Sequence, residues 1–196
     1  DILTETDSSE KRQQEFVRNS EMFQQELDVD ETLAQLLVAE PGQQFTVGQV
    51  RWDTAGVWDP GPVMAGGEGE SSSENDSSII AVAEVAGLRV LLPGDAEPEG
   101  QAKALRSAAQ HGMSLAVHVL KLPHHGSSRQ NQDFLASSGA MLAVASSGEN
   151  NPYGHPSPRT LQAAENLGMG IARTDQEGSI AVELRDGQLR VRRWQS

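Results

Sequence analysis

The middle of the chain alternates aliphatic runs with polar stretches that carry apolar residues at helical spacing. The runs "IIAVAEV" (79–85) and "LRVLLPGD" (88–95) are almost continuously apolar, which is typical of strands covered on both faces of a sheet. We predict further strands at 115–123 and 140–148, and helices at 97–112, 131–139 and 156–168. Strands and helices that follow one another in this way predict an α/β fold class.

Antiparallel elements flank this alternating region. The stretch "QFTVGQVRW" (44–52) alternates apolar and polar residues around a glycine and predicts a short hairpin. A strand at 170–175 is followed by "SIAVELRDGQLRVRRW" (179–194), in which Asp186 and Gly187 predict a tight hairpin turn. The predicted sheets are therefore mixed, with parallel and antiparallel neighbours.

The remaining stretches are polar. Residues 9–39 are helix-favouring, with apolar residues on one face, and predict one or two amphipathic helices. Residues 59–78 are rich in Gly, Pro, Ser and acidic residues and predict a flexible loop. A chain of 196 residues is of ordinary size for one domain, so we predict a single domain over 1–196.

Charge and cysteine content exclude several function classes. The formal net charge of −13 argues against a broad basic face that would hold nucleic acid by phosphate neutralisation. Without cysteine, a metal ion would have to be bound by His, Asp or Glu. No apolar run is long enough to span a membrane.

Two polar clusters follow neighbouring predicted strands. Asp95 ends "LRVLLPGD", and His124 and His125 follow the strand at 115–123. Asp95 could cap the next helix, and the histidines could form a hydrogen-bonded turn. Because ligands bind outside the carboxyl ends of strands in open α/β sheets, we expect the clusters to meet there and to bind a divalent metal ion.

A third cluster follows the strand at 140–148. The loop "GENNPYGHPSPRT" (148–160) contains Asn150, Asn151, Tyr153 and His155 between prolines. This loop could be a rigid connection only. The functional alternative is that its side chains bind a phosphate group at the same edge of the sheet.

Four motifs together identify a family. "NDSSIIAVAEVAGLRVLLPGD", "VLKLPHHGSS", "NPYGHPSPRTL" and "RTDQEGSIAV" occur in the order and spacing of the C-terminal metallo-β-lactamase-like domain of ComEC-type competence proteins. The chain resembles that domain from about Gly42 to its C-terminus. The resemblance implies metal-assisted hydrolysis of a phosphodiester, as a nuclease acting on DNA during uptake.

The resemblance also implies roles for the polar clusters. Asp95 corresponds to a carboxylate that bridges two metal ions, Zn or Mn, and His125 corresponds to a ligand of the second ion. His124 is then a neighbour that assists or replaces His125. All three are the candidate catalytic residues.

The loop and the setting follow from the same resemblance. Asn150, Tyr153 and His155 correspond to the substrate-binding loop. The partners would be single-stranded DNA and the rest of a membrane channel protein. The chain would be a soluble, extracytoplasmic domain of a bacterial plasma-membrane protein.

One expected motif is absent. Metallo-β-lactamase folds take most of their ligands from a His-x-His-x-Asp-His motif near the start of the domain, and all five histidines here lie between 111 and 155. We therefore expect this chain to be the second half of an αββα sandwich and to be inactive by itself. There are two alternatives: a phosphoesterase acting on a small phosphodiester, and a non-catalytic DNA-guiding module. The one basic strand that could serve such a module is "RVRRW" (190–194). Charge that protects the edge of a sheet also explains this strand.

Overall fold

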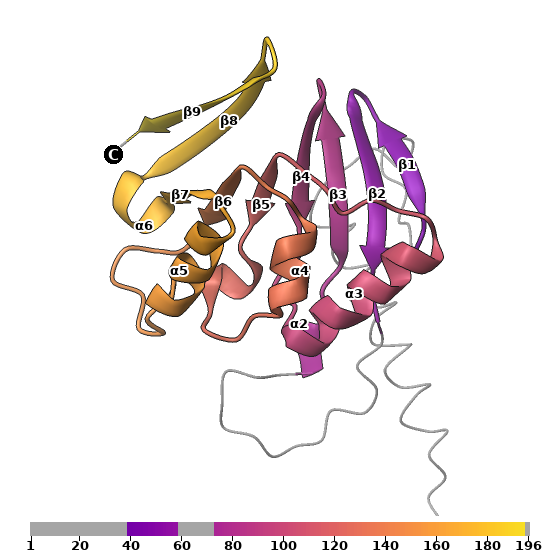
Figure 1. Cartoon of the computed structure of the whole chain (residues 1–196), viewed down its shortest axis with the longest axis horizontal. Coiled ribbons are helices and arrows are strands. Elements are labelled where there is room, and N and C mark those ends of the chain that lie inside the picture. Colours follow the sequence, from indigo (N-terminus) through magenta and orange to yellow (C-terminus); the bar gives the residue numbers. More distant parts are fainter. Residues whose placement is uncertain (1–38, 59–72, 195–196) are drawn as a thin grey trace, which may run out of the picture. The chain divides into compact units, whose positions relative to one another are not determined.

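The central element of the structure, a computed structural model that describes residues 39–58 and 73–194, is a seven-stranded sheet. Its strands occur along the sheet in chain order (Figure 1). They are β1 (Gln44–Val47), β2 (Val50–Gly56), β3 (Ile80–Val85), β4 (Leu88–Leu92), β5 (Val119–Lys121), β6 (Leu142–Ala145) and β7 (Gly170–Arg173). A separate two-stranded sheet is formed by β8 (Ser179–Arg185) and β9 (Gln188–Trp194).

The large sheet is mixed, as the sequence predicts. Strands β1 to β4 pair antiparallel, whereas β4 to β7 pair parallel. Each parallel pair is joined by a helix, as such crossovers require. The helices are α3 (Pro98–Gln110), α4 (Gln132–Ser137) and α5 (Pro158–Asn166). The predicted α/β class is confirmed, and the assignment to a metallo-β-lactamase fold stays a prediction.

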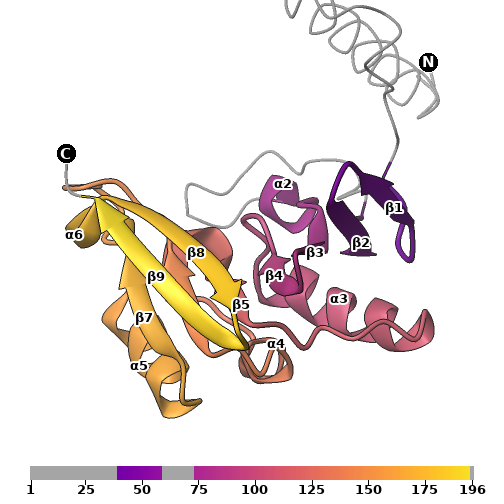
Figure 2. The same ribbon diagram turned by 90° about the horizontal axis from the view of Figure 1, so that it is seen from above.

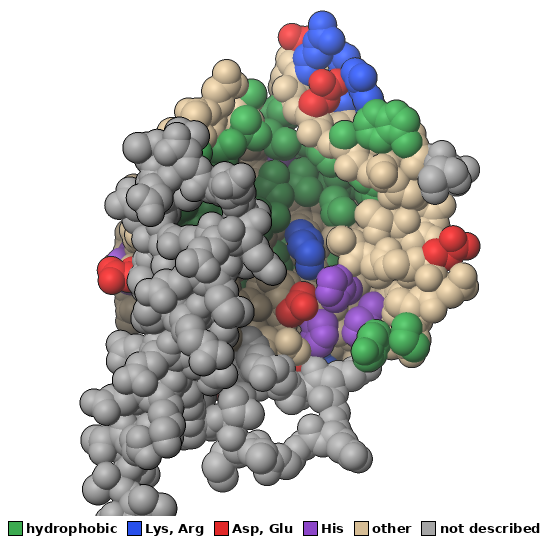
Figure 3. Space-filling model, turned by 180° about the vertical axis from the view of Figure 1, so that it is seen from behind, with side chains coloured by type: hydrophobic (Ala, Val, Ile, Leu, Met, Phe, Trp, Pro, Cys, Tyr) green, Lys and Arg blue, Asp and Glu red, His purple; other side chains and the backbone are tan. Residues whose placement is uncertain are grey.

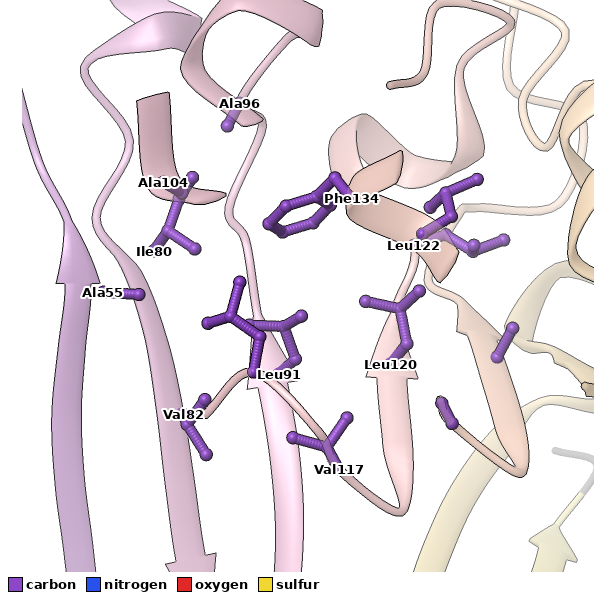
Figure 4. Packing of buried hydrophobic residues seen from close by; sticks show 14 of the residues in the cluster. Ala55, Ile80, Val82, Leu91, Ala96, Ala104, Val117, Leu120, Leu122 and Phe134 are labelled. Carbon is purple, nitrogen blue, oxygen red and sulfur yellow. The ribbon is translucent and has the colours of Figure 1, made fainter. Parts of the chain in front are cut away.

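Helices α3, α4 and α5 lie on one side of the sheet (Figure 1). The main core lies between them and the strands, and Figure 4 shows Phe134 of α4 beside Leu91 and Leu120 of the sheet. These three side chains are fully buried. Because successive strand residues point to opposite faces, the nearly continuous apolar runs also present a second apolar face.

The hairpin β8–β9 covers part of that second face. Its inward residues pack against a separate cluster of buried side chains: Leu88, Val119, Leu142 and Ala172. Figure 2 shows the two strands lying over the part of the sheet that contains β5 and β7. Burial on both sides of the sheet thus explains why the sequences of β4 to β6 are almost continuously apolar.

The tight turn predicted between the last two strands forms, whereas the two helix-cap residues differ from each other. Asp186 and Gly187 both have positive φ, 53° and 72°, as the tight turn between β8 and β9 requires. The Asn131 side chain accepts a hydrogen bond of 3.0 Å from the Phe134 N–H and caps α4. Ser157 occupies the cap position of α5, but its side chain makes no capping hydrogen bond.

Strand β5 is shorter than predicted. The sequence predicts a strand over 115–123, but only Val119–Lys121 is extended within the sheet. The His118 Nδ1 atom accepts a hydrogen bond of 3.0 Å from the backbone N–H of Arg89. The His118 imidazole thus occupies the Arg89 N–H group, which would otherwise donate to a backbone carbonyl oxygen of the parallel ladder. Pairing with β4 therefore begins only at Val119.

Two further differences lie outside the sheet. The short helix α6 (Thr174–Glu177) interrupts the predicted strand at 170–175. The predicted loop 59–78 is described only from residue 73, where α2 (Ser73–Asp76) forms a short helix. Residues 59–72 of that loop lie outside the described residues. The same holds for the helices predicted at 9–39, up to residue 38. Within 39–58 and 73–194, no helix is both long and apolar enough to cross a membrane.

Helix α2 supplies the cap of α3. The Asp76 Oδ1 atom accepts hydrogen bonds from the backbone N–H groups of Glu97, at 3.1 Å, and Gly100, at 3.0 Å. We expect Asp76→Ala to lower the free energy of unfolding by about 1 kcal/mol, because the N–H groups of Glu97, at the cap position, and Gly100, in the first turn, lose their acceptor. Urea denaturation of this variant beside Glu165→Ala, on the exposed side of α5, measures the difference; equal losses would contradict the capping role.

Candidate metal centre

Asp95 and His125 face each other at the carboxyl ends of β4 and β5. These strands are parallel neighbours, with Val90 opposite Val119. The Asp95 Oδ2 atom lies 3.5 Å from the His125 Nε2 atom, and both side chains are partly exposed, at 40% and 45%. The sequence predicts that these two residues meet, and the structure brings them together.

The other ring nitrogen of His125 determines which tautomer is present. The Nδ1 atom lies 2.6 Å from the backbone carbonyl oxygen of Ser146, just after β6. A carbonyl oxygen only accepts, so Nδ1 carries the proton and donates it there. In the neutral ring Nε2 then has a free lone pair that points at a carboxylate, and two facing acceptors suit a shared cation. This donor set fits a divalent metal ion.

Both histidines have a left-handed backbone. The φ angles are 45° for His124 and 54° for His125, in the region that residues with a Cβ atom rarely adopt. Each such residue costs about 1–3 kcal/mol and persists only where its surroundings enforce it. The turn therefore directs two adjacent imidazoles in a way that an ordinary extended connection would not.

His124 points toward a buried carboxylate rather than toward Asp95. Its Nδ1 atom lies 3.7 Å from the Glu97 Oε1 atom, and neither atom has a hydrogen-bond partner. The Glu97 side chain is only 4% exposed, and its Oε2 atom lies 3.0 Å from an Arg129 guanidinium nitrogen. The two histidines thus have different environments, which the sequence could not distinguish.

Lys121 ends β5, and its ammonium group lies beside the segment that carries Asp95. Its Nζ atom donates to the backbone carbonyl oxygens of Leu122, at 3.2 Å, and Gly94, at 3.5 Å. Burial lowers the pKa of this ammonium group, and the negative charge of Asp95 opposes the shift. Figure 3 shows histidine, acidic and basic side chains gathered on this side of the molecule.

The loop after β6 brings His155 to the histidine turn. The ring centroids of His124 and His155 are 5.4 Å apart, in an edge-to-face arrangement. Asn151 holds the loop closed, since its Oδ1 atom accepts from the His155 N–H at 3.1 Å and its Nδ2 atom donates to the carbonyl oxygen of His155. Tyr153 stacks on His155 and is 68% exposed. Asn150 is exposed and has a φ of 59°.

Comparisons with known proteins agree with the motifs. "ComE operon protein 3" of Bacillus subtilis (strain 168) is 32% identical over 112 residues, and "Competence protein ComA" of Neisseria gonorrhoeae is 29% identical over 127 residues. This chain is homologous to a part of ComEC-type competence proteins. The matched segments cover 57% and 64% of the chain but only 14% and 18% of the two relatives. No protein-family model matches the chain.

The alternative in which Asp95 caps a helix is wrong. Helix α3 begins at Pro98, and its free N–H groups are bound by Asp76 instead. The backbone N–H of Asp95 donates a hydrogen bond of 3.0 Å to the Ser78 Oγ atom. This contact holds the end of β4 and leaves the carboxylate directed at His125.

Sequence reasoning missed Glu97 and Lys121. The sequence contained a signal for Lys121, because a single lysine within an aliphatic strand is unusual: lysine is rarely buried unless it is paired. Glu97 had none, since an acidic residue before a helix is ordinary. Within 39–58 and 73–194, no group of three or more His, Cys, Asp or Glu side chains is arranged to hold a metal ion, so Asp95 and His125 form a two-residue pair.

The contact between Arg129 and Glu97 yields a stability prediction. We expect Arg129→Ala to lower the free energy of unfolding by about 1.5–3 kcal/mol, because it leaves a buried carboxylate without a charged donor. Lys103→Ala is the control, since Lys103 pairs with Glu99 at 3.2 Å on the exposed side of α3, and its loss should cost about 0.5 kcal/mol or less. Urea denaturation compares the two; similar losses would contradict the argument.

Burial of Lys121 predicts a dependence of stability on pH. Because the folded-state pKa lies below the ordinary value of 10.5, the unfolded chain binds more protons between these two pKa values, and stability rises with pH in that window. Below the window the charged group carries the full desolvation cost. We expect Lys121→Met to be more stable than the wild type at pH 7, with an advantage that shrinks toward pH 10.5 in chemical denaturation. An advantage that grew with pH would contradict this.

Proposed function

We propose that this chain contributes to DNA uptake as part of a membrane-associated ComEC-type protein. Two relatives carry competence names, and the matched segments cover 57% and 64% of this chain. Within that role we propose an extracytoplasmic, metal-dependent phosphodiesterase domain of the metallo-β-lactamase type that acts as a nuclease on DNA. The observation that carries the finer proposal is the 3.5 Å approach of the Asp95 Oδ2 atom to the Nε2 atom of His125, whose ring is held through Nδ1 by the Ser146 carbonyl oxygen.

Asp95 and His125 would hold the ion, which is Zn or Mn by its oxygen and nitrogen ligands. A bound divalent ion supplies Lewis acidity toward a phosphodiester. The protein's own contribution is orientation. The Ser146 carbonyl group holds the His125 ring, and Ser78 holds the backbone at Asp95.

The remaining polar residues would act on the substrate. His124, which lies between Glu97 and His155, would support the substrate-binding loop from beneath the site. Asn150 and Tyr153 are exposed, Tyr153 stacks on His155, and these three residues would bind the phosphodiester. The loop is suited to this because Asn151 fixes its shape in advance.

The number of ligands limits what the chain can do by itself. Catalytic zinc takes three protein ligands and water, whereas Asp95 and His125 are two, with His124 turned toward Glu97. We therefore expect weak metal binding and no metal-dependent cleavage of DNA by the 196-residue chain. A non-catalytic DNA-guiding module of the same fold is the alternative that this ligand count favours.

Zinc titration of the 196-residue chain by calorimetry tests the proposal. We expect Asp95→Asn and His125→Asn each to weaken zinc binding at least about tenfold. Asparagine suits position 125 because it tolerates a positive φ, so the turn is kept while the ligand is lost. His111→Asn, at the end of α3, is the matched control and should bind zinc like the wild type.

A zinc affinity that is unchanged in Asp95→Asn would contradict the proposed metal site. Robust zinc- or manganese-dependent cleavage of labelled DNA by the 196-residue chain would support the nuclease assignment and contradict only the expectation that further ligands are needed. Circular dichroism of each variant separates loss of ligand from loss of fold.

A further inference from the structure

The outward face of β9 carries a row of basic and aromatic side chains. Arg190, Arg192 and Trp194 alternate with Leu189 and Val191, which pack inward against the sheet. Because alternate residues of a strand share a face, the three outward side chains form one line with steps of roughly 6.6 Å. We call these three residues the β9 row.

The two arginines of the β9 row are available to a ligand. Arg190 is exposed and has no ion-pair partner among the residues that the structure describes. Arg192 lies 3.3 Å from Glu183, but both side chains are exposed, at 64% and 42%. A pair of this kind contributes at most about 1 kcal/mol, so a phosphate group can replace the carboxylate. Arg193 points to the other face and is paired with Glu177.

Trp194 provides a flat apolar surface at the end of the β9 row. Its side chain is 53% exposed. It lines a shallow pocket of about 170 Å³ together with Ala181, Val182, Glu183 and Arg192. An indole ring kept in solvent next to a guanidinium group is the arrangement on which an unpaired base stacks.

We propose that the β9 row binds single-stranded nucleic acid, with phosphates on Arg190 and Arg192 and a base stacked on Trp194. This inference rests on the proposed function for its choice of DNA as the ligand. The net charge of −13 excludes general attraction of phosphates, so binding has to be local, and three of the 15 basic residues lie within 190–193. A duplex offers no free base face on which Trp194 could stack.

The β9 row and the candidate metal centre are compatible with one strand of DNA. Figure 3 shows basic side chains of the molecule's upper end and the histidines on the same visible side. The hairpin covers the face of the sheet to which Lys121 also belongs, because Lys121 and Val119 are two residues apart on β5. The β9 row would therefore hold a strand on the side where the polar cluster opens.

Fluorescence anisotropy of a labelled oligothymidylate, titrated with the 196-residue chain in EDTA, tests the β9 row. We expect Arg190→Gln combined with Arg192→Gln to weaken binding at least about tenfold. The slope of log affinity against log salt concentration should fall in magnitude by about 1.4, because two phosphate contacts are lost. Arg106→Gln combined with Arg159→Gln removes the same charge from exposed positions on α3 and α5 and should bind like the wild type.

Trp194 separates stacking from general charge attraction. We expect Trp194→Ala to weaken binding about tenfold, and Trp194→Phe to keep most of the affinity. The DNA-induced quenching of tryptophan fluorescence should disappear in Trp194→Phe although binding persists. Quenching that persists in this variant would overturn the stacking role.

Three results would overturn the inference: no binding of the oligonucleotide by the wild type, equal affinities for the two double variants, or binding of phosphatidylglycerol vesicles in place of DNA. EDTA keeps this test independent of the metal centre. A failure of the β9 row therefore leaves the zinc titration unaffected, and a failure of the zinc titration leaves the DNA titration unaffected.

Discussion

The parallel pairing of β4 with β5 sets the positions of Asp95 and the histidine turn at the candidate metal centre. Val90 lies opposite Val119 and Leu91 opposite Leu120, so both strands end at the same edge of the sheet. Asp95 follows one strand and the histidine turn follows the other. A shift of the register by one residue would exchange the two faces of β5 and move Lys121 away from this side.

Strain and burial around the histidine turn act together. Two consecutive residues with positive φ are unfavourable, and they are held by a backbone hydrogen bond on each side of the turn: His124 N–H to Gly94, and Ser127 N–H to His124. Gly126 is required beside them, because a Cβ atom there would lie 2.8 Å from Pro156. The loop that carries His155 is thus packed against the turn that carries the other two histidines. This packing orients the imidazoles before any ligand arrives.

The two faces of the sheet are covered by different elements. The helices α3, α4 and α5 bury the main core, which gives the strands their stability and their order. The hairpin β8–β9 buries a smaller cluster and leaves its outer face free. An edge hairpin rich in arginine also resists pairing with other chains, so the charge of β9 serves solubility whether or not a ligand binds there.

The sequence by itself determined the class of the fold, the approximate positions of the strands along the chain, both hairpins and the three crossover helices. These are local properties, because aliphatic continuity, turn residues and helix-ending glycines act over a few neighbouring positions. It also identified Asp95 and the histidine pair, since polar residues that end buried strands stand out from the pattern. Only the tertiary structure decided which histidine faces Asp95 and which faces Glu97. That choice depends on the φ angles of two residues and on a carbonyl group 21 positions away in the chain, and no local pattern encodes either.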